Sequence, residues 1–154
     1  MIQIRKAGLE DVRMIKEIAD LLYLNIPGFD WNKEGFIKGQ IEKGEYYVAV
    51  SSEALAKEGR ILGITSLRER NEMLYIETLA VAKDVQSKGV GSKLVDFARQ
   101  FARENNFKIL RTASFYEFDP RVKDFWIKQG FRLLDEPGEY GGYKFYRLEF
   151  KLND

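Results

Sequence analysis

The sequence predicts a single domain over residues 1–154 with a mixed α/β (α+β) fold. Its length of 154 residues matches one domain of ordinary size, and its hydrophobic content of 45% suffices to bury a core. The first half predicts a meander of strands, whereas the second half alternates strands with amphipathic helices. We therefore expect a mostly antiparallel central sheet of about seven strands with helices on both faces.

The amino-terminal part is predicted to hold one strand and two helices. Residues Ile2–Arg5 form the strand, and a helix opens at Gly8–Asp11 because apolar residues then recur at helical spacing. That apolar stripe consists of Val12, Ile15, Ala19 and Leu22. After a turn over residues 25–30, Asp30 is predicted to cap a helix over Trp31–Ile41, which we expect to be irregular because it contains two glycines.

An antiparallel run of three strands is predicted next, over Tyr46–Ser51, Ile61–Arg68 and Met73–Val81. A polar loop containing residues 57–59 joins the first two strands, and Asn71-Glu72 forms a two-residue turn between the others. The turn sets the register of the hairpin and thereby predicts which side chains of the two strands lie opposite one another.

With Asn71 and Glu72 as the turn, Tyr75 would lie opposite Arg68 and Glu77 opposite Ser66. Tyr75 and Glu77 would then share one face of the strand, because side chains alternate with a period of two.

The second half is predicted to alternate helices and strands. Its elements are a helix over Ser92–Glu104, a strand over Lys108–Phe115, a helix over Arg121–Gln129, a strand over Phe131–Leu134, a loop over Asp135–Gly142 and a strand over Tyr143–Lys151. The helical crossover makes the strands that end near Val81 and Ser114 parallel neighbours.

The composition excludes several classes of function. The chain contains no cysteine and no histidine, which removes disulfides, thiol nucleophiles, Cys/His zinc sites and Ser-His-Asp triads. Its 25 Lys plus Arg and 24 Asp plus Glu give a net charge of +1, and no helix-turn-helix pattern is present, so we expect no nucleic-acid partner.

No segment of the sequence predicts contact with a membrane. The amino terminus has no apolar run typical of a signal peptide, and no stretch approaches the ~20 apolar residues that span a bilayer. We expect a cytoplasmic protein without a membrane partner.

The most informative motif is Gln86-Ser87-Lys88-Gly89-Val90-Gly91-Ser92, which joins a buried strand to an amphipathic helix. Its glycines allow a tight turn and a close approach of backbone N–H groups to an anion at the helix N-terminus. A P-loop would need a glycine at Gln86 and a lysine at Ser92, and a dinucleotide fingerprint would need a glycine at Leu94. The motif therefore predicts a phosphate site of another kind, or else a tight turn without a ligand.

The segment Gln86-x-x-Gly89-x-Gly91, preceded by Leu79-Ala80-Val81, resembles the acyl-CoA-binding motif of the GCN5-related N-acetyltransferase (GNAT) superfamily. The resemblance extends over nearly the whole chain, from the first strand to the pair Gly130-Phe131. It implies the GNAT fold, with a parallel pair at strands four and five that splays apart. It also implies direct acetyl transfer from acetyl-CoA to an amine, with no metal and no covalent enzyme intermediate.

Several cofactor contacts are implied by the same resemblance. The backbone of Leu79 and Val81 would pair with the pantetheine arm, and the Val81 N–H would polarise the thioester carbonyl. Amides from Gln86 to Ser92 would hold the pyrophosphate. The implied cofactor-binding positions are Leu79, Ala80, Val81, Gln86, Ser87, Lys88, Gly89, Val90, Gly91, Ser92, Asp119 and Phe125.

One departure from the family concerns the tyrosine that in many members protonates the departing thiolate. Trp126 occupies that position here, and an indole has no proton that it can transfer at ordinary pH. Tyr116, just after a strand, is a candidate to supply the proton, or it is an ordinary aromatic residue at a strand end. Trp126 and its neighbour Phe125 are predicted to pack the helix against the sheet.

Glu77 is the candidate general base, because a carboxylate in an apolar strand is unusual and burial would make it a better proton acceptor. The alternative is that Glu77 only pairs with Arg68 or binds a cationic substrate. Tyr75 is a candidate to orient the substrate or to act through water, or it is a core residue.

The loop Asp135–Tyr143 and the turn near Asn25–Trp31 match the regions that line the family's acceptor pocket. Acidic residues there would attract an amine, and Tyr140 and Tyr143 are candidate contacts. The leading hypothesis is an N-acetyltransferase acting on a peptide N-terminus, a lysine or a small amine, with a homodimer possible by analogy. The alternatives are a non-catalytic acetyl-CoA-binding module and a nucleotide-phosphate-binding protein of another family.

Overall fold

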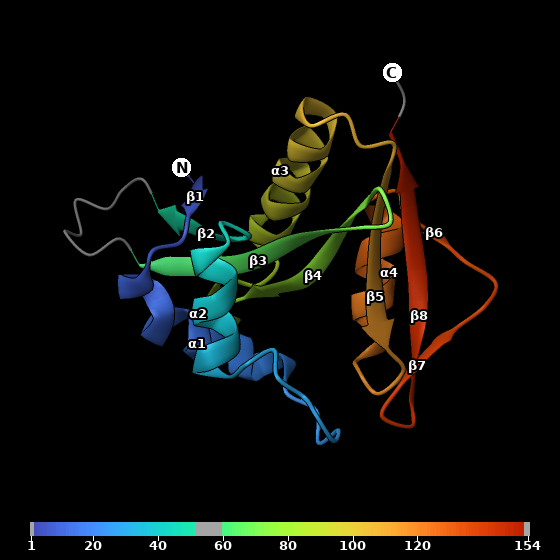
Figure 1. The fold of residues 1–154 in the computed structure, drawn as a ribbon, viewed down its shortest axis with the longest axis horizontal. Coiled ribbons are helices and arrows are strands. Elements are labelled where there is room, and N and C mark those ends of the chain that lie inside the picture. The colour runs from blue at the N-terminus through green and yellow to red at the C-terminus, as the bar shows by residue number, and fades with distance from the viewer. Residues whose placement is uncertain (1, 52–59, 153–154) are drawn as a thin grey trace.

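The computed structural model describes residues 2–51 and 60–152, which form one eight-stranded sheet between two layers of helices (Figure 1). The strands are β1 (Ile2–Lys6), β2 (Tyr46–Ser51), β3 (Ile61–Arg70), β4 (Met73–Val81), β5 (Ile109–Phe115), β6 (Arg132–Leu133), β7 (Gly138–Tyr140) and β8 (Tyr143–Lys151). The helices are α1 (Val12–Ala19), α2 (Glu34–Glu42), α3 (Val90–Glu104) and α4 (Pro120–Lys128), with short 3-10 turns at η1 (Leu9–Asp11), η2 (Asp20–Leu22) and η3 (Lys83–Val85). None of the described helices is long and apolar enough to cross a membrane.

The strands lie in the order β1-β2-β3-β4-β5-β8-β6, and β7 pairs with β8. All neighbouring pairs are antiparallel except β4 and β5, which are parallel because α3 crosses between them. The predicted mixed, mostly antiparallel fold is therefore confirmed.

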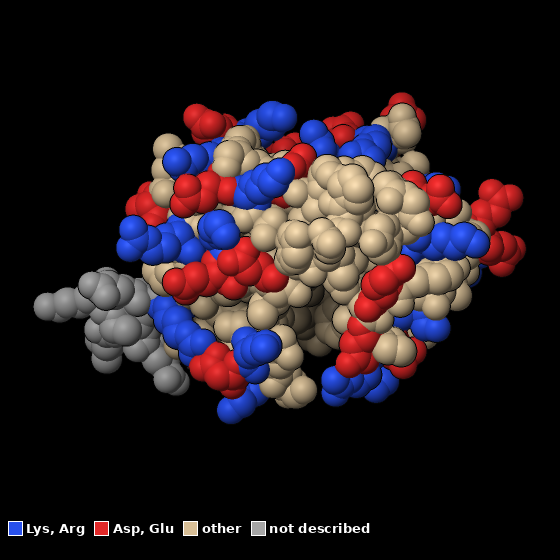
Figure 2. Space-filling view, turned by 90° about the horizontal axis from the view of Figure 1, so that it is seen from below, with Lys and Arg blue, Asp and Glu red and all other residues tan. Residues whose placement is uncertain are grey.

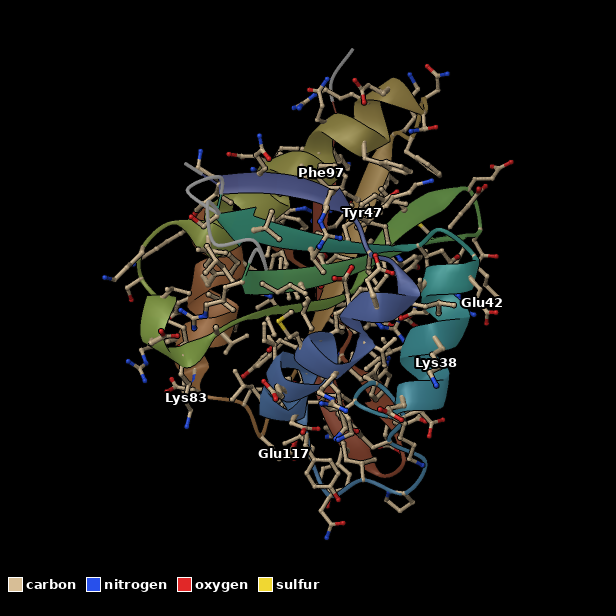
Figure 3. The ribbon with its side chains drawn as sticks, turned by 90° about the vertical axis from the view of Figure 1, so that its left-hand side faces the viewer. Lys38, Glu42, Tyr47, Lys83, Phe97 and Glu117 are labelled. Carbon is tan, nitrogen blue, oxygen red and sulfur yellow. The ribbon has the colours of Figure 1, made fainter. Side chains whose placement is uncertain are left out.

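The two helical layers bury two faces of the sheet. On the face that we call the front, α1 and α2 cover β2 to β4, while α3 and α4 lie on the back (Figure 1). On the back, the ring of Tyr47 lies 4.7 Å from that of Phe97 on α3, and Figure 3 shows the two side chains next to each other. On the front, Lys38 and Glu42 mark the outer side of α2 in Figure 3, whereas Gln40 between them is buried.

The parallel strands β4 and β5 pair only at one end. Their register contains Leu74 with Leu110 and Tyr75 with Arg111, although β4 continues to Val81. Beyond these pairs the two strands diverge, and the gap opens toward the lower edge of Figure 1. The predicted splay is thus confirmed, and it leaves polar backbone groups of both strands without a strand partner.

The structure differs from the prediction at one loop and at the start of one helix. The loop predicted over Asp135–Gly142 contains the short strand β7, which makes eight strands rather than about seven. Helix α2 begins at Glu34 with Lys33 as its N-cap, so the predicted Asp30 cap is wrong; Asp30 instead pairs with the side chain of Lys33 at 3.0 Å. The predicted polar loop at residues 57–59 lies outside the described residues.

Two further expectations concerned helix regularity and helix onset. The expected irregularity of α2 is absent, since the α-helix is uninterrupted from Glu34 to Glu42 through both of its glycines. Helix α3 begins at Val90, two residues before the predicted start at Ser92, because Gly89 supplies the left-handed residue from which the helix can start.

The predicted register of the β3–β4 hairpin is half correct. Tyr75 lies opposite Arg68 as expected, but Ser66 lies opposite Thr78 rather than Glu77. A β-bulge between Ser66 and Leu67 shifts the pairing by one residue and leaves Glu77 without a direct partner on β3. The turn fixed the register only as far as this bulge.

Candidate functional site

The loop between β4 and α3 has the backbone geometry of an anion site. Ser87 and Gly89 both adopt left-handed conformations, with φ of 69° and 86°. A run of this kind turns successive N–H groups toward one concave side. A Cβ at Gly89 would meet nothing within 4 Å, so the loop is open to solvent at this residue.

Helix α3 directs its N-terminal N–H groups into the same region. Its first bond runs from the Lys93 N–H to the Gly89 carbonyl at 3.1 Å, so the N–H groups of residues 90–92 have no acceptor within the helix. A Cβ at Gly91 would lie 3.2 Å from the ring of Phe125. The absence of a side chain at residue 91 therefore makes room for α4 to approach the loop. Free donors, the helix dipole and nearby Lys88 and Lys93 together favour a phosphate.

The end of β4 presents backbone groups to the gap between β4 and β5. The Ala82 N–H donates to the Leu62 carbonyl in β3 at 2.8 Å, so the N–H and C=O of Val81 point to the opposite side, into the gap. There the Gln86 side chain donates to the Val81 carbonyl at 3.1 Å and ties the loop to the strand end. The Val81 N–H thus has the position of a free donor at the base of the gap.

Glu77 is held on the front face of β4 by two side chains. The Gln40 amide of α2 donates to its Oε1 at 2.6 Å, and Arg68 donates to its Oε2 at 3.3 Å. The Glu77 side chain retains 13% of its exposure. Ile76 and Leu79 both pack toward α3, on the back face. Because of the bulge, the two residues between them, Glu77 and Thr78, both face the front.

Sequence analysis missed two residues beside Glu77. Tyr46 is 1% exposed, and its hydroxyl has no hydrogen-bond partner among the described residues. Burial raises the pKa of Tyr46, the negative charge of Glu77 adds to this increase, and nearby Thr78 opposes it. Gln40, 4% exposed, keeps its Oε1 unpartnered as well. The one signal in the sequence was the place of Gln40 three residues after Ile37, on the apolar side of the helix.

The two candidate tyrosines lie in different surroundings. Tyr75 is on the front face, where the Arg70 guanidinium lies 5.4 Å from its ring centroid and Arg111 approaches its hydroxyl. Tyr116 follows β5, is 44% exposed, and stacks on the ring of Tyr146 at 4.2 Å. Tyr75 and Glu77 are brought close by their strand, whereas Tyr116 lies at the other side of the gap.

The remaining candidates are accounted for by structure around α4. Asp119 is the N-cap of α4, and its carboxylate accepts from the Arg121 N–H at 2.9 Å. Trp126 is buried in the core with its ring 5.1 Å from that of Phe131, as the packing prediction required. Phe125 lies against both Trp126 and Gly91, so it is at the back of the glycine loop.

The two segments expected to line an acceptor pocket meet in the structure. Tyr140 of β7 donates to the Gly28 carbonyl at 2.9 Å, and Tyr143 of β8 donates to the Asn25 carbonyl at 3.3 Å. The Trp31 ring lies 5.4 Å from that of Tyr140, which extends the contact. Figure 2, the view from below, shows a broad area without charged side chains beside a hollow on the side where β4 and β5 diverge.

A cavity of about 800 Å³ lies elsewhere, at the far end of α3 from the glycine loop. Its walls include Glu45, Tyr47, Phe101 and Asn105. Among residues 2–51 and 60–152, no group of three or more acidic side chains is arranged to hold a metal ion. The glycine loop and the adjoining gap form the candidate site, because the free backbone donors lie there.

Comparison with known proteins identifies the family and the fold. A sequence model of the acetyltransferase (GNAT) family matches residues 14–131, more than half of the chain. The fold is similar to that of Ard1 from Thermoplasma volcanium, with a TM-score of 0.80 and 19% identity over 99% of each chain.

Two further solved structures share the fold. The PaiA N-acetyltransferase from Thermoplasma acidophilum, solved in complex with coenzyme A, has a TM-score of 0.75 and 16% identity over 98% of this chain and 99% of that chain. The ribosomal-protein-S18-alanine N-acetyltransferase from Escherichia coli has a TM-score of 0.73 and 14% identity over 100% of this chain and 96% of that chain.

Proposed function

The chain belongs to the acetyltransferase (GNAT) family and is an acyltransferase, and we propose that it transfers an acetyl group from acetyl-CoA directly to a primary amine. The observation that supports this most is the glycine loop, whose first N–H groups have no acceptor within α3 and which Gln86 ties to the end of β4 at Val81. The amine belongs to a peptide N-terminus, a lysine or a small molecule.

In this proposal the loop from Gln86 to Ser92 binds the pyrophosphate of the cofactor. The pantetheine arm then enters the gap and pairs with the backbone of Leu79 and Val81, as an added strand would. Ala80 alternates with them, and its side chain belongs to the front core. Phe125 supports the loop from behind, while the contribution of Asp119 is to begin α4 beside it.

The reaction is a nucleophilic substitution at the thioester carbon. The amine lone pair forms the new C–N bond, the carbonyl oxygen becomes negative in the tetrahedral intermediate, and the Val81 N–H stabilises that charge. When the C–S bond breaks, the electron pair leaves with the CoA sulfur. The amine loses one proton overall, and the thiolate gains one.

The proton steps are assigned to side chains around the gap. Glu77 is the proposed base, and its bonds to Gln40 and Arg68 fix the direction of its carboxylate. Tyr116 is the proposed donor to the thiolate, because Trp126 is buried and has no suitable proton. Tyr75 orients the acceptor from the same strand.

Two of the similar proteins support the choice of both substrates. PaiA was solved with coenzyme A, which favours an acyl-CoA at the corresponding loop here. The Escherichia coli enzyme is described as acting on the alanine of a ribosomal protein, so a polypeptide amine is compatible with this fold.

The test is a calorimetric titration of the purified protein with acetyl-CoA, with ADP and ATP as controls. Binding well above the controls, followed by thiol release with a panel of amines, is the expected result. Equal binding of the adenine nucleotides would favour the nucleotide-phosphate alternative and contradict the proposal. Tight binding without turnover on any amine would favour a non-catalytic acetyl-CoA-binding module.

A further inference from the structure

The front face of the sheet holds a row of charged side chains that runs across five strands. Direct cross-strand partners connect Arg68 of β3 to Tyr75 of β4, Tyr75 to Arg111 of β5, Arg111 to Glu149 of β8, and Glu149 to Arg132 of β6. We call these five residues the arginine row. Because direct partners share a face of a sheet, all five side chains belong to the same side.

That side is the front, because the residue preceding each of four row members packs into the back core. These preceding residues are Leu67, Leu74, Leu110 and Leu148, all buried with α3 residues. Side chains alternate along a strand, so the row itself points to the front. Over β5 and β8 no described helix covers this face (Figure 1), and Ala113 in the middle of β5 is exposed accordingly.

The row and its neighbours carry an excess of positive charge. Arg70 lies two residues from Arg68 along β3, and Arg147 and Lys151 lie two residues on either side of Glu149 along β8. All three side chains are exposed and, because of this spacing, belong to the same face as the row. The carboxylates among the front-facing strand positions are Glu77, paired with Arg68, and Glu149, paired with Arg111 at 2.9 Å and with Arg132 at 3.4 Å. Six cations thus face two carboxylates.

Two of these arginines retain their full charge for a ligand. Within the described part of the chain, Arg70 contacts the ring of Tyr75 at 5.4 Å and Arg147 contacts the ring of Phe145 at 5.7 Å, but neither pairs with a carboxylate. A guanidinium that contacts a ring and no carboxylate keeps its N–H donors available for a carboxylate ligand. Both arginines are exposed, so an incoming anion can reach them.

We infer that the acceptor amine belongs to a peptide with carboxylate side chains close to its N-terminus, and that the exposed Arg70 and Arg147, which flank the arginine row, bind those carboxylates. This inference rests on the proposed acetyl transfer, because the row lies only two residues along β4 from Glu77. From Arg68 to Arg132 the row crosses four strand spacings, about 19 Å, which matches about six residues of extended peptide. That length favours a peptide over a single small anionic amine.

The test compares acetylation of peptides that differ only at positions two to four, which are aspartate, asparagine or lysine. The expected result is a KM about tenfold lower for the aspartate peptide than for the asparagine peptide, with the ratio shrinking as salt rises. Arg147→Gln and Arg70→Gln should each reduce this ratio severalfold, and Arg147→Glu should favour the lysine peptide. Arg103→Gln removes the same charge from an exposed site at the end of α3 and should leave the ratio unchanged.

Each contrary outcome has a separate meaning. Equal KM values for the three peptides, or a ratio that the Arg147 and Arg70 variants leave intact, would overturn the inference while acetyl transfer stands. Free glutamate acetylated better than any peptide would show a small anionic acceptor and would also overturn it. No transfer to any amine by a protein that binds acetyl-CoA would overturn the proposed function and this inference with it.

Discussion

The two ends of the β4–β5 pair differ in how their polar groups are satisfied. At the paired end, the two strands exchange backbone bonds at Leu74–Leu110 and Tyr75–Arg111, and Glu149 is 6% exposed between two arginines. At the open end, the strands have separated, and the Val81 N–H and the first N–H groups of α3 are left for a ligand. One strand pair therefore provides rigidity at one end and binding groups at the other.

This difference explains where substitutions should affect stability and where they should affect activity. Groups at the paired end satisfy one another, so their loss leaves buried partners unpaired and weakens the fold. The free N–H groups at the open end, by contrast, have no intrahelical or strand partner to lose. Glu77 lies between the two ends, in the bulge, and has only one arginine at 3.3 Å.

The largest effect is expected for Gly89→Glu at the open end. A carboxylate in the loop would repel the pyrophosphate and fill the space that the open backbone leaves, so acetyl-CoA affinity should fall by more than about 100-fold. Calorimetric titration measures the loss. The matched control is Gly89→Ala, which imposes the same left-handed strain of about 1–2 kcal/mol without the charge. Equal affinity losses in both variants would assign the effect to backbone strain.

Glu77→Gln should be next in size, with kcat lowered about 100-fold near neutral pH and a smaller loss at high pH. The reason is that the amine loses its proton to solvent at high pH and then needs no base. The pH profile of kcat for the variant and wild type is the measurement. Glu69→Gln, an exposed carboxylate on β3, is the control. A parallel loss at every pH would mean that Glu77 binds or positions the acceptor.

The same contrast separates what the sequence could and could not predict. The glycine loop, the order of elements and the parallel direction of β4 and β5 follow from local signals: two glycines at a strand–helix junction, alternation and a helical crossover. The splay of these two strands was implied only by the resemblance to the GNAT family. The neighbours of Glu77 do not follow from local signals, because Gln40 is far away in the sequence and reaches Glu77 through packing of α2. The bulge at Glu77 also has no local signature, and because of it the register prediction was wrong beyond that point.

The arginine row was equally hidden from sequence analysis. Its members come from five strands, and each follows a core residue, which is a leucine for four of them and Phe131 for Arg132. Only the register of the whole sheet brings them into one line. The Asp30 cap failed for a related reason, since Asp30 forms an ion pair with Lys33 instead of receiving the helix N–H groups.

At the paired end, Glu149→Gln should lower the free energy of unfolding by about 1–3 kcal/mol, because Arg111 loses its buried partner. Chemical denaturation measures this loss, and acetyl-CoA affinity should stay within about twofold of wild type. Arg132→Gln should cost less, since the Arg132 side chain is 66% exposed. A large drop in cofactor affinity with unchanged stability would contradict the division between the two ends.

Asp11→Asn should give the smallest effect, and it tests whether a buried carboxylate remote from both ends behaves like Glu149. The Asp11 side chain is 5% exposed and accepts from Arg5 at 2.8 Å and from the Gly8 N–H at 2.8 Å. Burial alone would raise the pKa of Asp11, but these hydrogen bonds outweigh burial and lower it below the ordinary value of 3.8. Because the pKa of Asp11 is lower in the folded than in the unfolded protein, the ionised carboxylate stabilises the fold above the unfolded pKa. This stabilisation is lost as the pH falls through the folded pKa.

The variant should therefore be less stable than wild type by about 1 kcal/mol at neutral pH, with the difference shrinking below a pH of about 4. Urea denaturation of both proteins between pH 7 and pH 3 measures this difference. Cofactor affinity at neutral pH should not change, because Asp11 joins η1 to β1 and contacts neither end of the β4–β5 pair. A stability difference that is constant with pH would instead assign the cost to altered packing at Asp11, and would show that its charge contributes nothing to the fold.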